Sequence, residues 1–458
     1  MAGIGFELRK ILREDSWLGV LKAYLYAGAL GSGAWVLSVL GVLLVGATGL
    51  TGNAGLQTWL SEFQVSVTWI MSGSLVTSAV FQLVFTRFIA DCLYQDKQTS
   101  VVPNLLGAIG LVTLLSFVLG SLSMAVLAAW DRYLYNLLFL FSYIVLCNIW
   151  ILVVFVAGLR RYRFLLAGFF LAYTLIVMLA WLWQEQGVES KLLAFFLGHG
   201  ALLLWLFWAI LKEYPVSDQF LVSFEFLEPS QAQYSLCFSG LFLYLGIWID
   251  KWMFWFFPET SIAINAFLRA SPIYDPEIFI AYLAMIPGMA AFLLRIETDF
   301  VDACQGYYRI LTTSTLSRIE EAREEMLQTL SSALLEVLRI QGLTMILVWL
   351  FANDIAQWLG WPEEYAWFLR VDVMATSLLV LFISLLNVAF YFNFLRLALW
   401  MTAGLCLLNA LLTLLTLLLG KSWYGVGFTL SLLLVVVLAW WALSVKTKRL
   451  EYETFMLQ

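Results

Sequence analysis

An aspartate and a lysine stand side by side at positions 250 and 251, inside the apolar stretch GIWIDKWMFWFF. Charged side chains inside a membrane-spanning helix each cost roughly 2.5–3.5 kcal/mol on insertion scales, so they usually face a water-filled cavity or a partner helix. Neighbouring side chains on a helix point about 100° apart, which favours a separate partner, or water, for Asp250 and for Lys251. We therefore interpret these two residues as candidates for the lining of a polar path.

Aromatic residues share the helical face of Lys251 and form a basic and aromatic ridge with it. The aromatic members of this ridge are Tyr244, Trp248 and Trp255. A later apolar run carries Arg370 and Asp372, which we expect to provide counter-charges at a similar depth. The alternative is that Lys251 extends outward to the membrane surface, while Trp252 and Trp255 belong to the interfacial aromatic belt.

Uncharged polar residues line one face of the second long apolar run, EFQVSVTWIMSGSLVTSAVFQLVFTRF. They recur at helical spacing and are followed by an arginine: Gln64, Thr68, Ser72, Gln82, Thr86 and then Arg87. Hydrogen-bonding groups without charge suit a neutral hydroxylated cargo, and the aromatic ridge suits stacking on sugar rings. Hydrogen bonds between helices explain the serines and threonines equally well.

The chain that positions these residues has the composition of a membrane protein. Its 458 residues are 62% hydrophobic and only 12% charged, which is more apolar than a soluble core requires. Runs of about 20 apolar residues, long enough to cross a bilayer, recur throughout. We expect an all-α polytopic protein with twelve transmembrane helices, at 20–46, 60–88, 104–129, 134–157, 164–184, 191–211, 235–257, 277–296, 337–352, 365–391, 397–420 and 424–445.

Positive charge is distributed unevenly around these spans. Of the 25 Lys and Arg residues, 19 fall on the side of the N-terminus and six do not, namely Arg132, Lys191, Lys251, Arg269, Arg370 and Lys421. Because Lys and Arg gather in cytoplasmic loops, both termini are predicted to be cytoplasmic. The formal charge of −6 says little beside this asymmetry. We expect no nucleic-acid partner.

The expected spans divide into two lobes of six helices. We expect an N-lobe at 20–211 and a C-lobe at 235–445, an amphipathic N-terminal cytoplasmic helix at 1–19, a cytoplasmic connector at 212–234, and a cytoplasmic tail at 446–458. A further amphipathic cytoplasmic helix is predicted at about 312–336, with Ser317 and Glu320 at capping-box spacing. Its apolar face is a possible partner surface. The alternating FLVSFEF of the connector favours a linker packed on its own protein over a strand against a partner.

No catalytic or metal-binding constellation stands out in the sequence. The single histidine, His199, stands in an apolar run without an acidic residue or cysteine nearby, which favours a polar residue in helix packing over a proton relay. The glycines of GALGSGAW (28–35) lie inside a span and predict close helix packing, not dinucleotide binding. We expect no cofactor, no metal, no enzymatic activity and five free thiols.

The opening MAGIGFELRKIL, the first-span GSGAWVLSVLGVLLVG and the division six and six resemble the inner-membrane transport proteins of Pel exopolysaccharide systems, the PelG family. That family is similar to the MOP flippase superfamily, which includes polysaccharide and lipid II flippases and MATE exporters. The resemblance implies two six-helix lobes around a central cavity, in the bacterial inner membrane. It also implies a galactosamine-rich polymer as cargo and, as partners, a cytoplasmic glycosyltransferase, a cyclic-di-GMP receptor membrane protein and another membrane subunit.

We therefore expect an exporter that passes a growing exopolysaccharide from a cytoplasmic synthase to the periplasm for a biofilm matrix, in contact with membrane lipid. Three alternatives remain open: a flippase for lipid-linked oligosaccharides, a cation-coupled exporter of small molecules, and a scaffold that anchors a glycosyltransferase without transport. A pyrophosphate-linked cargo would call for a markedly cationic cavity, and the carboxylates of Asp250 and Asp372 argue weakly against it.

Overall fold

The structure is a computed structural model. It describes residues 17–450 apart from 48–60, 128–131, 159–161, 184–185, 215–220, 229–233, 266 and 312. The N-terminal helix expected at 1–19 and the tail expected at 446–458 therefore fall mostly outside the described residues. Within the described part, eleven helical segments are long and apolar enough to cross a membrane, or twelve when the two segments of α2 (Trp17–Ala47) count as one span. The expectation of an all-α polytopic protein is confirmed.

The chain forms two compact units. The central unit is Ala34–Asp275, and the terminal unit combines the described residues before Ala34 with those from Pro276 onward. Helix α8 (Tyr234–Phe256) packs on α3 (Glu62–Tyr94) in the central unit, and the first half of α2 packs in the terminal unit. The boundaries of these two units differ from those of the lobes expected at 20–211 and 235–445. The division into these lobes stays a prediction.

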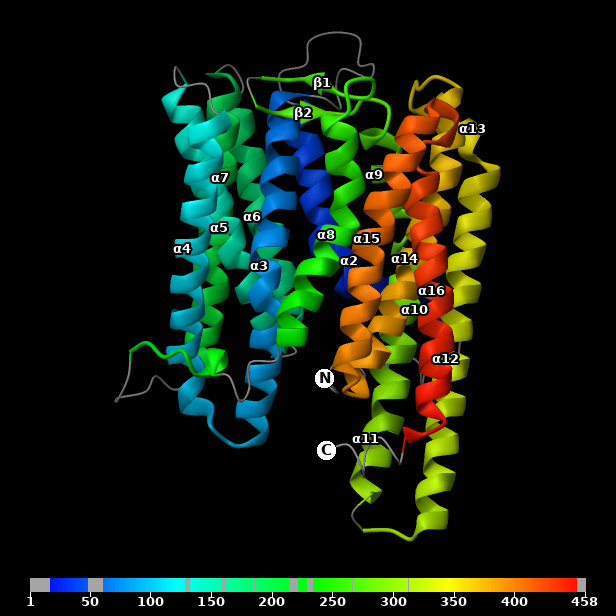
Figure 1. Ribbon diagram of the computed structural model, residues 1–458. Coiled ribbons are helices and arrows are strands. Elements are labelled where there is room, and N and C mark those ends of the chain that lie inside the picture. The colour runs from blue at the N-terminus through cyan, green and yellow to red at the C-terminus, as the bar shows by residue number, and fades with distance from the viewer. Residues whose placement is uncertain are drawn as a thin grey trace. The chain divides into compact units, whose positions relative to one another are not determined.

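In the central unit, the most extensive packing joins helices that are not consecutive in sequence, such as α3 and α8 (Figure 1). Beside α3 and α8 it contains α4 (Val101–Leu127), α5 (Tyr133–Gly158), α6 (Tyr162–Leu182), α7 (Val188–Glu213), and the short 3-10 helices η2 (Gln98–Ser100) and η4 (Glu225–Leu227). A two-stranded antiparallel hairpin follows α8, with β1 (Ile262–Ala263) and β2 (Arg269–Ala270) in the register Ile262↔Ala270. Helix α3 begins with a capping box, in which Ser61 and Gln64 satisfy each other's backbone N–H groups.

The connector packs on the central unit, as the sequence favoured. Its described part bonds to the start of α4, because Ser223 N donates to Pro103 O at 3.0 Å and Phe226 N donates to the Asn104 side chain at 3.4 Å. Phe226 is buried, and its ring lies edge-on to Phe85. Residues 221–228 form loop and a 3-10 turn, so the alternative of a strand is wrong for this described part.

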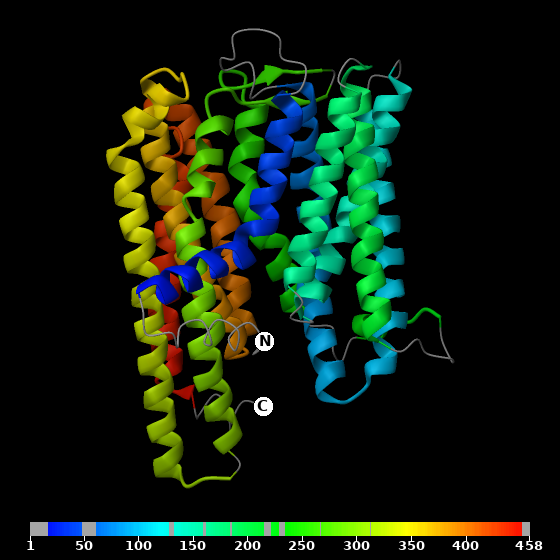
Figure 2. The same cartoon turned by 180° about the vertical axis from the view of Figure 1, so that it is seen from behind.

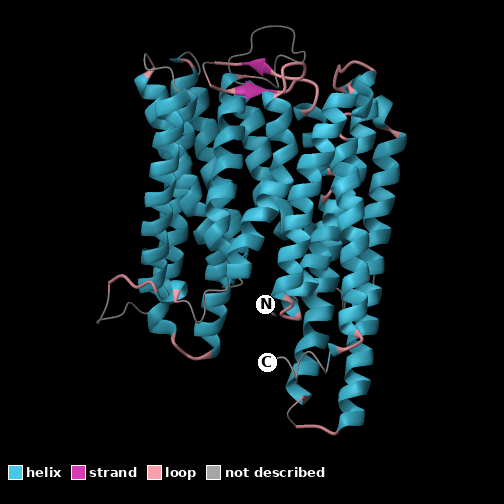
Figure 3. Cartoon of the chain, in the orientation of Figure 1, coloured by secondary structure: helices cyan, strands magenta, loops and turns pink. Residues whose placement is uncertain are grey.

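The terminal unit is a second helical bundle, seen from behind in Figure 2. After α2 it contains α9 (Asp275–Leu283), α10 (Ile286–Leu294), the π-helix η5 (Arg295–Phe300), α11 (Val301–Ile310), α12 (Leu316–Leu350), α13 (Ala352–Trp358), α14 (Glu364–Tyr391), α15 (Leu395–Leu419), the 3-10 helix η6 (Lys421–Trp423) and α16 (Val426–Thr447). A Cβ added at Gly31 of α2 would lie 2.4 Å from Leu293 Cδ1 of α10, so the close packing predicted for the glycine-rich first span is confirmed. Figure 3 shows how little of the described chain is not helical.

The eighth span is longer and less regular than the expected 277–296, because it runs from Asp275 to Ile310 through α9, α10, η5 and α11. The helix is interrupted before Pro287, which cannot supply a backbone N–H. Gln341 of α12 donates to the carbonyl of Ala284 at this interruption at 3.1 Å and to Ser377 Oγ at 2.9 Å. A Cβ at Gly288 would lie 2.2 Å from Gln341 Oε1, so a larger residue here would displace the Gln341 side chain from these bonds.

The amphipathic helix expected at 312–336 and the span expected at 337–352 are one continuous helix, α12. Its N-cap is Thr315 without a side-chain cap, so the capping box expected from Ser317 and Glu320 is wrong. Helix α11 and the start of α12 project past the other helices of the terminal unit (Figures 1 and 2). Met326 and Leu334 of α12 are buried, so much of the apolar face proposed for partners packs within the chain.

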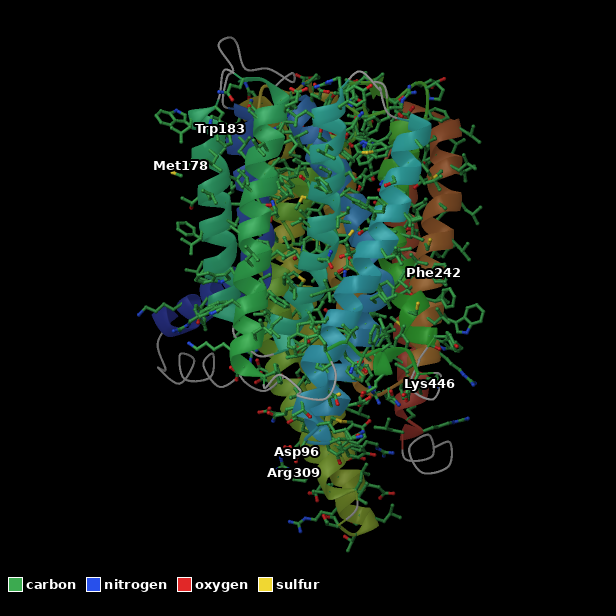
Figure 4. All side chains as sticks on the ribbon, turned by 90° about the vertical axis from the view of Figure 1, so that its left-hand side faces the viewer. Asp96, Met178, Trp183, Phe242, Arg309 and Lys446 are labelled. Atoms are coloured by element: carbon green, nitrogen blue, oxygen red, sulfur yellow. The ribbon has the colours of Figure 1, made fainter. Side chains whose placement is uncertain are left out.

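Side chains on the outer faces of the bundles are apolar, as contact with lipid requires. Met178 of α6 is 49% exposed, and it points away from the helices with Trp183 at the end of this span (Figure 4). Asp96, which follows α3, lies at the opposite end of the central unit from Trp183. This arrangement agrees with spans that run alternately up and down.

Candidate functional site

Asp250 and Lys251 form a buried ion pair on α8. Lys251 Nζ lies 2.9 Å from Asp250 Oδ2 and 3.1 Å from Oδ1, and it also donates to the carbonyl of Ile247 at 2.9 Å. The two side chains are 3% and 0% exposed. The expectation that adjacent residues cannot neutralise each other is therefore wrong, because the long lysine side chain folds back along its own helix. The alternative in which Lys251 extends to the membrane surface is wrong as well.

Two residues that the sequence analysis missed complete this arrangement. Tyr274 donates its hydroxyl to Asp250 Oδ2 at 2.7 Å, and Asp275 accepts the Trp255 indole N–H at 2.8 Å. The carboxylate of Asp275 also accepts the backbone N–H of Ser271 at 2.8 Å. These bonds tie the end of α8 to the segment that begins the next span. The one available sequence signal was Asp275 directly before a proline, which is typical of a helix start.

The aromatic ridge predicted on α8 is present, and a further tryptophan extends it. Trp248 and Trp255 have ring centroids 6.4 Å apart, and Trp69 of α3 stacks on Trp255 at 4.9 Å. Trp255 is buried, whereas Trp248 and Tyr244 are half-buried. Tyr244 donates its hydroxyl to Gln82 Oε1 of α3 at 3.3 Å, so the structure brings together two candidates from different spans.

The other polar candidates of α3 bond mainly within their own helix, and Ser72 also accepts the indole N–H of Trp252 from α8 at 3.4 Å. Thr68 donates to the backbone carbonyl of Gln64, and Ser72 donates to that of Trp69. Gln64 belongs to the capping box, and Arg87 pairs with Asp91 one turn later. The structure gives these residues local structural contacts, and their contact with cargo stays a prediction.

Arg370 and Asp372 belong to the terminal unit. Arg370 is half-buried, with its guanidinium 5.1 Å from the ring centroid of Trp349 and its Nη2 3.2 Å from Asn353 Oδ1. Asp372 is fully buried against the start of α16, where a Cβ at Gly425 would lie 2.9 Å from Asp372 Oδ1. Their role as counter-charges to the pair on α8 stays a prediction.

A charged cluster at one end of the central unit was not foreseen from the sequence. Arg132 pairs with Glu62 of α3 and with Glu189 of α7, and its guanidinium lies 4.4 Å from the ring centroid of Tyr135. Hydrogen bonding to Glu189 raises the pKa of Arg132 further above its ordinary value, so this residue stays charged. The cluster joins three helices at their ends.

His199 of α7 occupies a packing site, as the sequence favoured. Its Nδ1 lies 2.9 Å from the carbonyl of Phe195, and its Nε2 lies 3.2 Å from the hydroxyl of Tyr173. Among the described residues, no group of three or more His, Cys, Asp and Glu residues has the geometry to hold a metal ion. The five cysteines are free thiols.

Transporters are among the solved structures whose fold is similar to this chain. An outward-facing multidrug resistance MATE family transporter of the MOP superfamily matches with a TM-score of 0.68 and 12% identity, over 94% of this chain and 96% of the other. A MOP superfamily transporter from Pyrococcus furiosus Vc1 matches at 0.64 and 12%, with the same coverage. A mutant of the Vibrio cholerae MATE transporter VcmN matches at 0.62 and 15%, over 99% of each chain. Identities this low show the fold alone.

No curated protein matches the chain. One protein family does, over residues 1–455, under the description "PelG: Putative exopolysaccharide Exporter (EPS-E)". The match covers nearly the whole sequence and agrees with the MOP fold of the solved structures. The chain therefore belongs to the PelG family of exopolysaccharide exporters, a family of transporters and not of enzymes.

Proposed function

We propose that this protein carries a growing, galactosamine-rich exopolysaccharide across the bacterial inner membrane for a biofilm matrix. In this proposal a cytoplasmic glycosyltransferase supplies the polymer, and a cyclic-di-GMP receptor membrane protein and another membrane subunit complete the complex. The observation that carries the proposal is the family match over residues 1–455. In this proposal both termini are cytoplasmic, which the distribution of Lys and Arg supports.

The charge arrangement supports a polymer over a pyrophosphate-linked oligosaccharide. Lys251 is the basic residue of the ridge, and its ammonium is held by the carboxylate of Asp250. A cavity for a pyrophosphate would be expected to present cationic groups to the cargo. A sugar chain instead needs aromatic faces and hydrogen-bonding groups. Trp248 of the ridge provides an aromatic face.

Trp248 gives the sharpest test of export. Its indole can cover a sugar ring without demanding one pattern of hydroxyl groups, which suits a chain that must slide. We expect Trp248→Ala to reduce export, whereas Trp248→Phe keeps an aromatic face and most of the activity. Trp181→Ala is the matched control, because Trp181 lies on the outer face of α6 and is 60% exposed.

The assay uses inverted membrane vesicles that contain the whole complex. Sugar nucleotide is supplied outside, and the polymer protected from an added glycoside hydrolase is measured together with total synthesis. Loss of protected polymer with intact synthesis in Trp248→Ala, but not in Trp181→Ala, would place the defect in transport. If the wild-type complex synthesises polymer but never protects it, the protein is a scaffold and the proposal fails.

A further inference from the structure

A cavity of about 270 Å³ lies in the central unit, between α3, α4, α5, α8 and the loop that joins β1 to β2. All four of these helices are long and apolar enough to cross a membrane, so the cavity lies among membrane-spanning segments. Aromatic rings form much of its wall, including Trp69, Phe139, Trp252 and Phe267. None of the described residues that line it is charged. A ligand here would meet aromatic and aliphatic surface.

The indole N–H groups of the wall are already engaged within the protein. Trp69 Nε1 donates to the carbonyl of Arg269 at 2.9 Å, and Trp252 Nε1 donates to Ser72 Oγ at 3.4 Å. The hydroxyl of Ser72 in turn donates to the carbonyl of Trp69 at 3.1 Å. A ligand that required hydrogen bonds would have to break these contacts.

The remaining hydroxyls of the wall are engaged in the same way. Ser123 Oγ donates to the carbonyl of Leu119 at 2.8 Å, and the Tyr143 hydroxyl lies 2.6 Å from Thr77 Oγ1. A sugar buried in such a wall would leave its own hydroxyls without partners, which costs about 1–3 kcal/mol for each group. The wall therefore fits a ligand with no polar groups.

Two glycines create the space. A Cβ at Gly120 of α4 would lie 2.5 Å from Leu140 Cδ1, so a larger residue here would have to displace the Leu140 side chain of α5. A Cβ at Gly73 of α3 would lie 3.4 Å from Tyr143 Cε2, which is ordinary contact. Larger side chains at position 73 would therefore enter the cavity without displacing the backbone.

The cavity opens beside apolar surface. Ser123 and Phe256 of the wall are exposed, the latter by 58%, and Leu119 and Leu122 next to Ser123 are 40% and 62% exposed. An unfilled apolar void forfeits dispersion contacts on all its walls, and a flexible hydrocarbon chain restores them. The volume lies just below the roughly 300–1,000 Å³ of sites that enclose drug-sized ligands, so a segment of one chain fits better than a whole headgroup.

We propose that this cavity binds one fatty acyl chain of a bilayer phospholipid. The chain enters beside Ser123 and lies against Trp69 and Trp252, where it fills the gap between α3 and α8. A filled gap stabilises the packing of α8, the helix that carries the ridge, on α3. The inference is independent of the cargo, so it can hold or fail whether or not the protein exports a polymer.

Photo-cross-linking tests the proposal on the full-length protein. The protein is reconstituted in phospholipid vesicles that contain phosphatidylethanolamine with a diazirine in its acyl chain, and labelled residues are mapped by peptide mass spectrometry. We expect labels on the cavity walls of the wild type, and their loss when Ser123→Phe or Gly73→Leu fills the space from either side. Gly110→Phe is the control, because a side chain at this position on α4 meets open space.

Each other outcome overturns the proposal. Equal labelling of the walls in the wild type and in both filling variants would mean general contact with lipid and no bound chain. Displacement of the label by a galactosamine oligosaccharide would make the cavity a sugar site. Displacement by a polyprenyl phosphate at a concentration where added phosphatidylethanolamine has no effect would assign it to an isoprenoid carrier instead.

Discussion

The buried pair on α8 makes a quantitative prediction about stability. Asp250→Asn leaves the ammonium of Lys251 buried without its carboxylate, and Lys251→Met leaves the carboxylate buried without its ammonium. Both side chains are almost fully buried, at 0% and 3% exposed, so solvent cannot compensate for the lost partner. Breaking a buried pair of this kind typically costs about 3–5 kcal/mol, whereas replacing both partners by neutral groups is often close to neutral.

We therefore expect each single variant to unfold at a clearly lower temperature and the double variant Asp250→Asn with Lys251→Met to recover most of the loss. Unfolding of the purified protein can be followed by its intrinsic fluorescence, since the chain has 21 tryptophans. The coupling energy is the difference between the loss of stability in the double variant and the sum of the losses in the two single variants. It should be at least about 3 kcal/mol, because each single variant leaves a buried charge without its partner and the double variant leaves none.

Additive losses in the cycle would refute this reasoning, because they would mean that each charge has its main partner elsewhere. Exchanging the charges in Asp250→Lys with Lys251→Asp should recover less than the neutral double variant, since the exchange gives up the bonds to Ile247 and Tyr274. The neutral double variant also separates structure from transport. If it is stable but exports no polymer, the charges act on cargo or on a coupling ion, and if it exports normally, the pair is structural.

Substitutions at three further sites test contacts elsewhere in the fold. Gln341→Leu removes the donor to the carbonyl of Ala284 and should lower the free energy of unfolding by about 1–3 kcal/mol. Gly288→Ala should destabilise the same crossing, and it should do so less when it is combined with Gln341→Ala. Thermal unfolding measures both effects. Arg132→Ala should cost about 1 kcal/mol because its pairs are partly exposed, and the cost should shrink at high salt; an unchanged cost at high salt would contradict an ionic cause. Leu334→Glu should lower the amount of folded protein, because this side chain is buried, and normal levels with selective loss of the glycosyltransferase in pull-downs would restore the docking hypothesis.

The positions of most spans follow from the sequence because hydropathy is a sum over about 20 residues and tolerates local detail. The expected 365–391 agrees closely with α14, Glu364–Tyr391. The eighth and ninth spans differ from the expected ones because hydropathy averages over local detail. A window average records neither the interruption before Pro287 nor the π-helix after α10, and it cannot tell that the charged start of α12 continues into its apolar end.

The sequence indicated which residues belong to the site better than it indicated which contacts these residues make. The angle between adjacent Cβ atoms suggested that Asp250 and Lys251 could not meet, but four methylene groups let the lysine ammonium fold back to a carbonyl one turn earlier. Tyr274 and Asp275 were missed because they lie between two apolar runs, where position in sequence gives no sign of which helix they contact. Such contacts depend on tertiary packing, which a single sequence does not specify.

The hydrogen bonds inside the spans decide which residues remain able to act on a polymer. The hydroxyls of Thr68 and Ser72 donate to carbonyls of their own helix, and the side chain of Gln82 accepts a hydrogen bond from Tyr244 of α8. A cargo that used these groups would have to break bonds that hold the helices together. An aromatic ring can bind a sugar without breaking a hydrogen bond, because stacking uses the face of the ring and not a donor or acceptor. The half-buried Trp248 is therefore the candidate whose loss should affect transport most and stability least, which is why its comparison with Trp181 carries the most weight.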